Sequence, residues 1–522
     1  MRRQLVLTTA ATAALVAAAG PALGQSMPMS MAMPAHNAKP AAKKAVRKKA
    51  PATMAKLTQK AARSAHKTSE KVSGSMTMRM GGWMPTPSQS MPGGQMVMPT
   101  PPATPGAPMT MPMNQQQTSQ MGPTEMQGME HGMQAMTMKA ALGPYPEQRE
   151  SSGTAWQPDA SGAMDGPMTM AGGWMLMAHG IVNLVYDHQS GRRGGNKTFV
   201  SGMLMGMANR PVGDGMLQLR AMLSPDPLMG PRGYPLLLAT GETANGRTPL
   251  IDRQHPHDLF MELSASLSQD IGRGSSVFIY GGLPGEPAFG PPAFMHRESI
   301  MDSPEAPISH HWLDSTHISF GVVTAGIIIG SVKLEASRFN GREPDQHRWN
   351  IETGPLDSTS MRLSWNPSRT LALQGSWGHF VSPEQLEPGV DQRRLSASAL
   401  WADEIAPGWR AAATLAWGRK TVQHQSDDAF AAEASLKHAG WTLFGRGERV
   451  DNPEVLGLQE QGRAFRVGKV SIGALRDFSI ADHLSFGAGG LFALNFVPDA
   501  LAPVYGGRNP IGAMGFLRLK LD

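Results

Sequence analysis

Apolar and polar residues alternate with a period of two along the C-terminal two thirds of the chain. From Gly172 onward, segments of roughly ten residues follow this alternation and are separated by Gly, Pro, Asn and Asp. In one such segment, Leu176, Ala178, Gly180, Val182, Leu184 and Tyr186 share one face, and His179 and Asn183 lie on the other. Successive side chains of a strand point to opposite sides of its sheet, so each segment predicts a strand with one apolar and one polar face.

Other segments repeat the pattern. Leu217, Leu219, Ala221 and Leu223 oppose Gln218 and Arg220, and Leu259, Met261, Leu263, Ala265 and Leu267 oppose Glu262, Ser264, Ser266, Ser268 and Asp270. In all, residues 172–522 contain about 14–16 candidate strands.

Two architectures use alternating strands of this kind. A soluble, secreted β-sandwich buries the apolar faces between two sheets and usually has shorter strands. A transmembrane barrel turns the apolar faces to lipid and the polar faces to its lumen. Strand length, charged residues on the polar faces and tryptophans near strand ends favour the barrel; the tryptophans are Trp174, Trp349, Trp365, Trp377, Trp401, Trp409, Trp417 and Trp441. We therefore expect an all-β protein with an antiparallel transmembrane β-barrel over residues 172–522, in contact with outer-membrane lipid.

The sequence before the barrel has a different composition. Residues 1–24 read as a signal peptide, with Arg2 and Arg3 before an apolar run. Residues 25–171 are rich in Met, Pro, Gln, Ser and Thr and poor in Val, Ile and Phe, which predicts a disordered tail in the periplasm. Within it, residues 39–71 carry 11 Lys and Arg against one acid, Glu70. This basic segment is typical of a solvated linker or of a segment attracted to anionic lipid, and we expect no nucleic acid partner.

The chain has no cysteine, so soft-metal chemistry has to use thioethers or imidazoles. Of the 38 methionines, 26 lie between Met27 and Met177, many as Met-x-Met: Met27, Met29, Met31 and Met33; Met76, Met78 and Met80; Met109, Met111 and Met113; and Met136 and Met138. In an extended chain this spacing places successive sulfurs on one side, and neutral thioethers favour Cu(I) or Ag(I) over harder ions. Copper as Cu(I) is the expected cofactor. The alternative is a low-complexity tail without a ligand.

Met203, Met205 and Met207 repeat the spacing inside an expected strand. Val200, Gly202, Leu204, Gly206 and Ala208 form its other face, so the alternation leaves open whether the sulfurs face the lumen or the lipid.

Histidine forms a second cluster along the chain. The candidate metal ligands are His255, His257 and Asp258 in one segment and His310 and His311 in another, with His296, His317 and His347 nearby in sequence. Each lies where strands are joined, so loop or rim positions are expected. We favour a network of hydrogen bonds and charges that pins an inward loop across the lumen. The pattern also suits a metal relay, and catalysis is the third alternative. The chain shows no nucleophile elbow, metalloprotease helix or nucleotide fingerprint, so we expect neither an enzyme nor an organic cofactor.

Three motifs carry a family resemblance. The segments TPLIDRQHPHD (residues 248–258), GEP (285–287) and SRFNGREPD (337–345) resemble a group of bacterial outer-membrane proteins. The overall plan of signal, Met-rich tail and barrel is similar to that of copper resistance protein B. That resemblance implies copper or silver binding, export or tolerance, with the tail sequestering Cu(I) and periplasmic copper proteins as partners. The alternatives are a general porin or anchor with a low-complexity tail, and a soluble secreted metal-binding β-protein.

Overall fold

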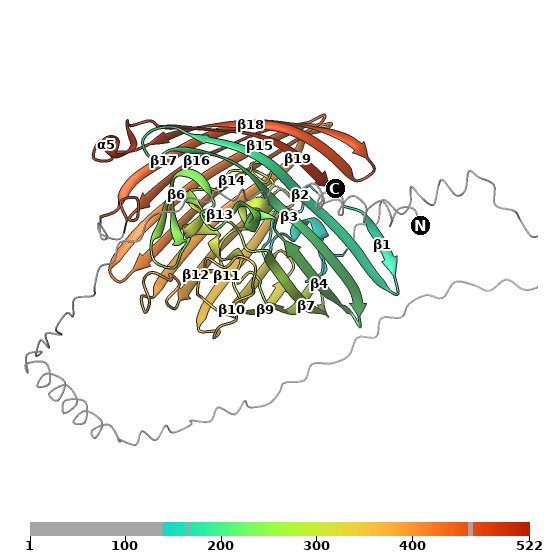
Figure 1. Ribbon diagram of the computed structural model, residues 1–522. Helices are drawn as coiled ribbons and strands as arrows, with labels where there is room; N and C mark the ends of the chain where they lie inside the picture. Colours follow the sequence, from blue (N-terminus) through green and yellow to red (C-terminus); the bar gives the residue numbers. More distant parts are fainter. Residues whose placement is uncertain (1–138, 163–165, 458–462) are drawn as a thin grey trace, which may run out of the picture. The chain divides into compact units, whose positions relative to one another are not determined.

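The computed structural model describes residues 139–162, 166–457 and 463–522, which belong to one compact unit, Gln116–Asp522. One antiparallel sheet dominates it (Figure 1). The barrel strands are β2 (Trp174–Gln189), β3 (Gly195–Val212), β4 (Gly215–Leu223), β7 (Phe260–Gly272), β8 (Ser275–Gly282), β9 (Val322–Ile329), β10 (Val332–Phe339), β11 (Ser358–Ser368), β12 (Leu371–Phe380), β13 (Gln392–Ala406), β14 (Trp409–Val422), β15 (Gln425–His438), β16 (Trp441–Asn452), β17 (Phe465–Ala481), β18 (Leu484–Phe496) and β19 (Ile511–Leu521).

The sheet closes on itself. Its last strand, β19, pairs with β2 from Gly512↔Gln189 to Leu521↔Gly180. A further short strand, β1 (Met168–Ala171), pairs with the start of β2, and it brings the sheet to 17 strands in the described residues. The other sixteen form the barrel. This confirms the prediction of an all-β, antiparallel barrel and rules out the two-sheet sandwich, because the sixteen strands close into one sheet and are not divided between two facing sheets.

The two ends of the barrel differ. At the end where β2 begins, tight two-residue turns join consecutive strands, as between β3 and β4, β7 and β8, and β9 and β10. At the other end the links are mostly long, and two of them, residues 224–259 and 283–321, carry elements of their own. Short turns at one end and long loops at the other are typical of transmembrane barrels.

The two faces of the wall differ as the alternation predicts. Leu184 on β2 is 48% exposed and Ile472 on β17 is 68% exposed, although both are large apolar residues. Lys333, Arg362 and other charged strand residues point inward and are buried. Trp409 and Trp441 are exposed at the short-turn end, where membrane barrels carry aromatic belts. The exterior is therefore suited to lipid.

The remaining elements are short. They are β5 (Tyr234–Thr243), β6 (Pro249–Gln254), the single-turn 3-10 helices η1 (Glu147–Arg149), η2 (Asp226–Met229), η3 (Phe294–His296) and η4 (Ser315–His317), and the helices α4 (His310–Leu313) and α5 (Ala502–Tyr505). None of the helices in the described ranges is long and apolar enough to cross a membrane.

Candidate functional site

Three stretches of chain fill the lumen. They are residues 139–162 before the barrel, residues 224–259 with the hairpin β5 and β6, and residues 283–321 with η3, α4 and η4. Leu236, Leu237 and Leu238 of β5 are at most 1% exposed, and they belong to the same apolar cluster as Trp312 of α4 and Phe444 of the wall. Figure 1 shows β6 within the ring of strands. The inward loops are thus packed as a core.

Buried ion pairs fasten residues 283–321 to the wall. The Arg297 guanidinium donates to Glu433 of β15 at 2.8 and 2.7 Å and to Asp314 at 2.5 Å, and its side chain is fully buried. Glu305 of the same loop pairs with Arg446 of β16 at 3.4 Å and with Lys469 of β17. Removing one partner of a buried pair costs about 3–5 kcal/mol, so these contacts hold the loop in one position.

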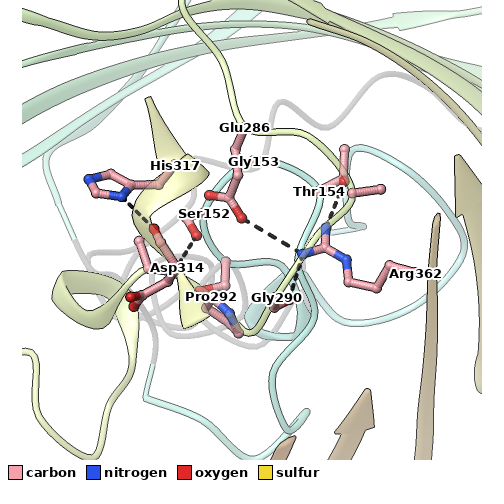
Figure 2. A network of polar contacts seen from close by, with 12 residues as sticks. Ser152, Gly153, Thr154, Glu286, Gly290, Pro292, Asp314, His317 and Arg362 are labelled. Carbon is pink, nitrogen blue, oxygen red and sulfur yellow. Dashed lines mark hydrogen bonds and ion pairs between the residues drawn. The ribbon is translucent and has the colours of Figure 1, made fainter. Parts of the chain in front are cut away.

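A third anchor joins residues 139–162 and the loop at one wall residue, Arg362 of β11 (Figure 2). Its guanidinium donates to Glu335 at 2.9 Å, to the Thr154 hydroxyl at 3.0 Å and to the Gly290 carbonyl at 3.0 Å. Glu286 lies 3.7 Å away. Two segments that are far apart in sequence therefore depend on the same side chain.

Residues 139–162 form a plug at the short-turn end of the lumen. Leu142, Tyr145 and Trp156 are buried against Phe278 of β8 and Ile328 of β9. The Ala160 amide donates to the Arg369 carbonyl, in the turn after β11, at 2.8 Å. The prediction of disorder is wrong for this segment, because the wall supplies the apolar partners that the segment lacks by itself.

Five histidines from two inward loops meet inside the barrel. His255 and His257 come from residues 224–259, and His310, His311 and His317 come from residues 283–321. Ring centroids are 5.2 Å apart for His257 and His317 and for His310 and His317, 5.7 Å for His310 and His311, and 5.6 Å for His255 and His311. The structure thus brings together the four candidate histidines and adds His317. All five lie in links between strands, as expected, and all five are buried.

Each ring of this histidine cluster has an oxygen partner. The contacts are His255 Nε2 to Glu242 at 3.2 Å, His257 Nδ1 to Asp226 at 2.9 Å, His310 Nδ1 to Asp314 at 2.8 Å, His311 Nδ1 to Glu343 at 3.4 Å, and His317 Nδ1 to the Asp314 carbonyl at 2.7 Å. Such partners hold the ring orientation and select which nitrogen carries the proton. Asp314 follows His310 by four residues, so the sequence alone could have predicted this contact. Glu242, Asp226 and Glu343 are brought in by the tertiary fold.

The protonation of the cluster is uneven. Burial lowers the pKa of His255 and of His317 well below the ordinary value, and it lowers the pKa of His310. Burial acts in the same direction on His311, but the Glu343 carboxylate raises the pKa of His311 above its ordinary value. As the pH falls, His311 therefore takes up a proton before His255, His310 and His317 do.

The cluster as it stands is a hydrogen-bonded network. Within the part of the chain that the structure describes, no group of three or more His, Asp or Glu side chains is arranged to hold a metal ion. The Nε2 atoms of His257 and His317 are buried without a hydrogen-bond partner. The metal-relay hypothesis therefore remains a prediction.

Other candidate residues lie elsewhere. Asp258 is buried and accepts from Arg348 at 3.1 Å, so its partner is a guanidinium. His347 lies on an exposed loop beside Asp345, away from the cluster. Twelve candidate ligands lie outside the described residues: Met27, Met29, Met31, Met33, Met76, Met78, Met80, Met109, Met111, Met113, Met136 and Met138.

Methionines of the wall point into the lumen. Met203 and Met205 of β3 are each 3% exposed, whereas Leu204 between them is 40% exposed. They form one cluster with Met222, Met261, Ile318 and Phe320, and Met207 packs against it. The face that the alternation left open is thus the lumenal one.

Met261 lies on the opposite face of its strand from the one that the alternation predicts. The alternation groups it with Leu263 and Leu267 on the lipid side, but Met261 is fully buried in the lumenal cluster. The pairing of β4 with β7 shifts register between Met222↔Glu262 and Leu223↔Phe260. This β-bulge adds a residue at Met261 and turns its side chain inward.

Comparisons with known proteins return fold similarity alone. No family model matches the chain, and no curated protein matches it. Among solved structures, the chain is similar to Salmonella typhi OmpF in complex with daunomycin, with 12% identity, 68% of this chain and 100% of that chain covered, and a TM-score of 0.44. It is also similar to the outer membrane channel DcaP of Acinetobacter baumannii, with 10% identity, 68% and 100% coverage and a TM-score of 0.39, and to the anion-selective porin from Comamonas acidovorans, with 11% identity, 66% and 99% coverage and a TM-score of 0.38. Similarity at this level concerns the barrel fold and says nothing about cargo.

Proposed function

We propose that the protein is an outer-membrane barrel that binds Cu(I) or Ag(I) and passes the ion through its occluded lumen, in export or tolerance of the metal. The observation that carries the proposal is the inward methionine cluster of Met203, Met205, Met222 and Met261. Inward positions of a transmembrane barrel are normally polar, because they face water. Four thioethers at such positions supply soft, neutral ligands where an ion has to pass.

The difference between the two ends of the barrel supports a tail in the periplasm. The chain enters β2 at the end with two-residue turns. In outer-membrane barrels the short turns face the periplasm and the long loops face outward. We propose on this ground that the Met-rich tail, which precedes residue 139, lies in the periplasm, where it collects Cu(I) and receives it from periplasmic copper proteins.

The chemistry favours a chain of weak sites. Thioethers bind Cu(I) without carrying charge, and buried neutral imidazoles add nitrogen ligands. An ion that binds too tightly at one site is not released to the next, so conduction needs several moderate sites. The methionine cluster and the histidine cluster adjoin at Ile318 and His317 and offer such a sequence.

A second candidate function is that of a general porin or membrane anchor with a low-complexity tail. One observation favours it: each of the five histidines in the cluster already contacts an oxygen at 2.7–3.4 Å, as a structural network requires. In that case the methionines serve to pack the inward loop against the wall.

Removing the sulfur from the methionine cluster separates the two functions. A triple Met203→Leu, Met205→Leu, Met222→Leu variant keeps the volume and hydrophobicity of the site. In a strain that lacks the gene, this variant should fold, as judged by its heat-modifiable migration on a gel, yet fail to restore copper tolerance. Met361→Leu, at a lipid-facing position of β11, is the matched control and should restore it. Full tolerance with the triple variant would favour the porin or anchor.

A further inference from the structure

A small cavity of about 90 Å³ lies at the short-turn end of the lumen, apart from the histidine cluster. It is lined by His179 of β2, Met203 of β3, His296 of η3 and Met301. Leu521 and Asp522 at the end of β19 and Gly162 of the plug also border it, which fixes its position near that end of the barrel. If the short turns face the periplasm, an ion arriving from the tail meets this cavity first.

Three of the four ring nitrogens of the two imidazoles at the cavity lack a hydrogen-bond partner. His179 is 5% exposed and His296 is 3% exposed. The Nε2 atom of His179 and both ring nitrogens of His296 are buried without a hydrogen-bond partner. Buried polar groups are nearly always satisfied, so nitrogens left open around a cavity indicate a ligand that fills it.

The charged groups around the cavity are already paired. Lys437 contacts Asp302 at 2.8 Å, Lys520 contacts Asp522 at 2.5 Å, and Arg410 donates to Glu298 at 3.1 Å. Burial lowers the pKa of His296 to about 3, so this ring is neutral at physiological pH. The donors that remain free are therefore neutral nitrogen and sulfur.

We propose that His179, His296, Met203 and Met301 form a Cu(I) site at the entrance of the lumen, an inference that rests on the proposed function. Two imidazoles and two thioethers match the preference of Cu(I) for soft and borderline ligands, and the set contains no carboxylate or thiolate that would favour Zn. Met203 also belongs to the inward methionine cluster, so the site is continuous with it. An ion released here moves next to Met205 and then toward His317.

The test counts Cu(I) ions on the full-length protein in detergent, with bathocuproine disulfonate as the competing chelator. A double His179→Leu, His296→Leu variant should lose one equivalent of Cu(I). The matched control, His188→Leu, lies on the same strand but is exposed, and should lose none. Met203→Leu is close to isosteric and should lower the affinity for this one Cu(I) ion by about 10-fold. This variant still tests the site if the double variant misfolds.

A third variant, with the tail Met-x-Met methionines replaced by Leu, separates this inference from the proposed function. It should lose the Cu(I) equivalents that the tail binds, and the ions that remain in the barrel should show both nitrogen and sulfur ligands by X-ray absorption. If the tail variant loses Cu(I) but the cavity variants bind as much as the wild type, the entrance site is refuted and the proposed function stands. If no variant changes Cu(I) binding, both fall.

Discussion

Replacing Arg362 with methionine should open the lumen. Arg362 is the common anchor of the plug, through Thr154, and of the long loop, through Gly290 and Glu286. Methionine keeps part of the side-chain volume but removes every one of these contacts. Glu335 keeps Lys333 as a partner at 3.1 Å, whereas Glu286 loses its cation inside the barrel.

The expected cost follows from burial. Arg362 is 1% exposed and its loop partner Glu286 is 4% exposed, and removing one partner of such a buried pair costs about 3–5 kcal/mol. The pairing of β11 with β10 and β12 uses backbone groups and survives the change. The loss therefore falls on the docking of the plug and loop, where 3 kcal/mol raises the undocked population by roughly 100-fold.

Conductance across a planar lipid bilayer measures this population. The Arg362→Met variant should open more often or more widely than the wild type, and Arg362→Met with Glu286→Gln should recover part of the closed state, because the uncompensated carboxylate is gone. Arg419→Met is the matched control, since Arg419 pairs with Asp428 near the outer surface and touches neither segment. A folded Arg362→Met protein with wild-type conductance would refute the anchoring role.

Three further predictions follow from the same network. Burial raises the pKa of Glu286 from 4.5 to about 7. A carboxyl group whose pKa is raised in the folded state stabilises that state at low pH, and this stabilisation is lost as the pH rises through about 7. Plug docking should therefore weaken and conductance increase between pH 5 and pH 8, and Glu286→Gln should flatten that dependence. Arg297→Met leaves Glu433 and Asp314 buried without their cation, so it should destabilise the docking of residues 283–321 by about 3–5 kcal/mol; an unchanged urea concentration for the undocking of this loop would contradict this. Trp156→Ala removes a buried ring that packs 5.2 Å from Tyr145 and should cost about 3–5 kcal/mol of plug docking; limited proteolysis should then cut within residues 139–162, and equal resistance to protease would argue against the plug.

The tertiary structure decided three features that no local pattern contains. Residues 139–162 are ordered because Phe278 and Ile328 lie on strands more than a hundred residues away. The histidine cluster forms because two long loops fold inward to the same point, and one of its oxygen partners, Glu343, comes from a third segment. The entrance cavity joins His179 of the wall to His296 of a loop, two positions that no spacing relates.

The amino-acid sequence by itself determined the strands, because side chains alternate across any sheet and lipid on one side enforces the alternation. Leu184 outside and His179 inside follow directly from it. The rule loses its power where both faces are apolar, as around Met203, and where a bulge changes the register, as at Met261. There the closure of the sheet and the pairing of neighbouring strands decide which side chain faces the lumen, because those pairings depend on residues far along the chain.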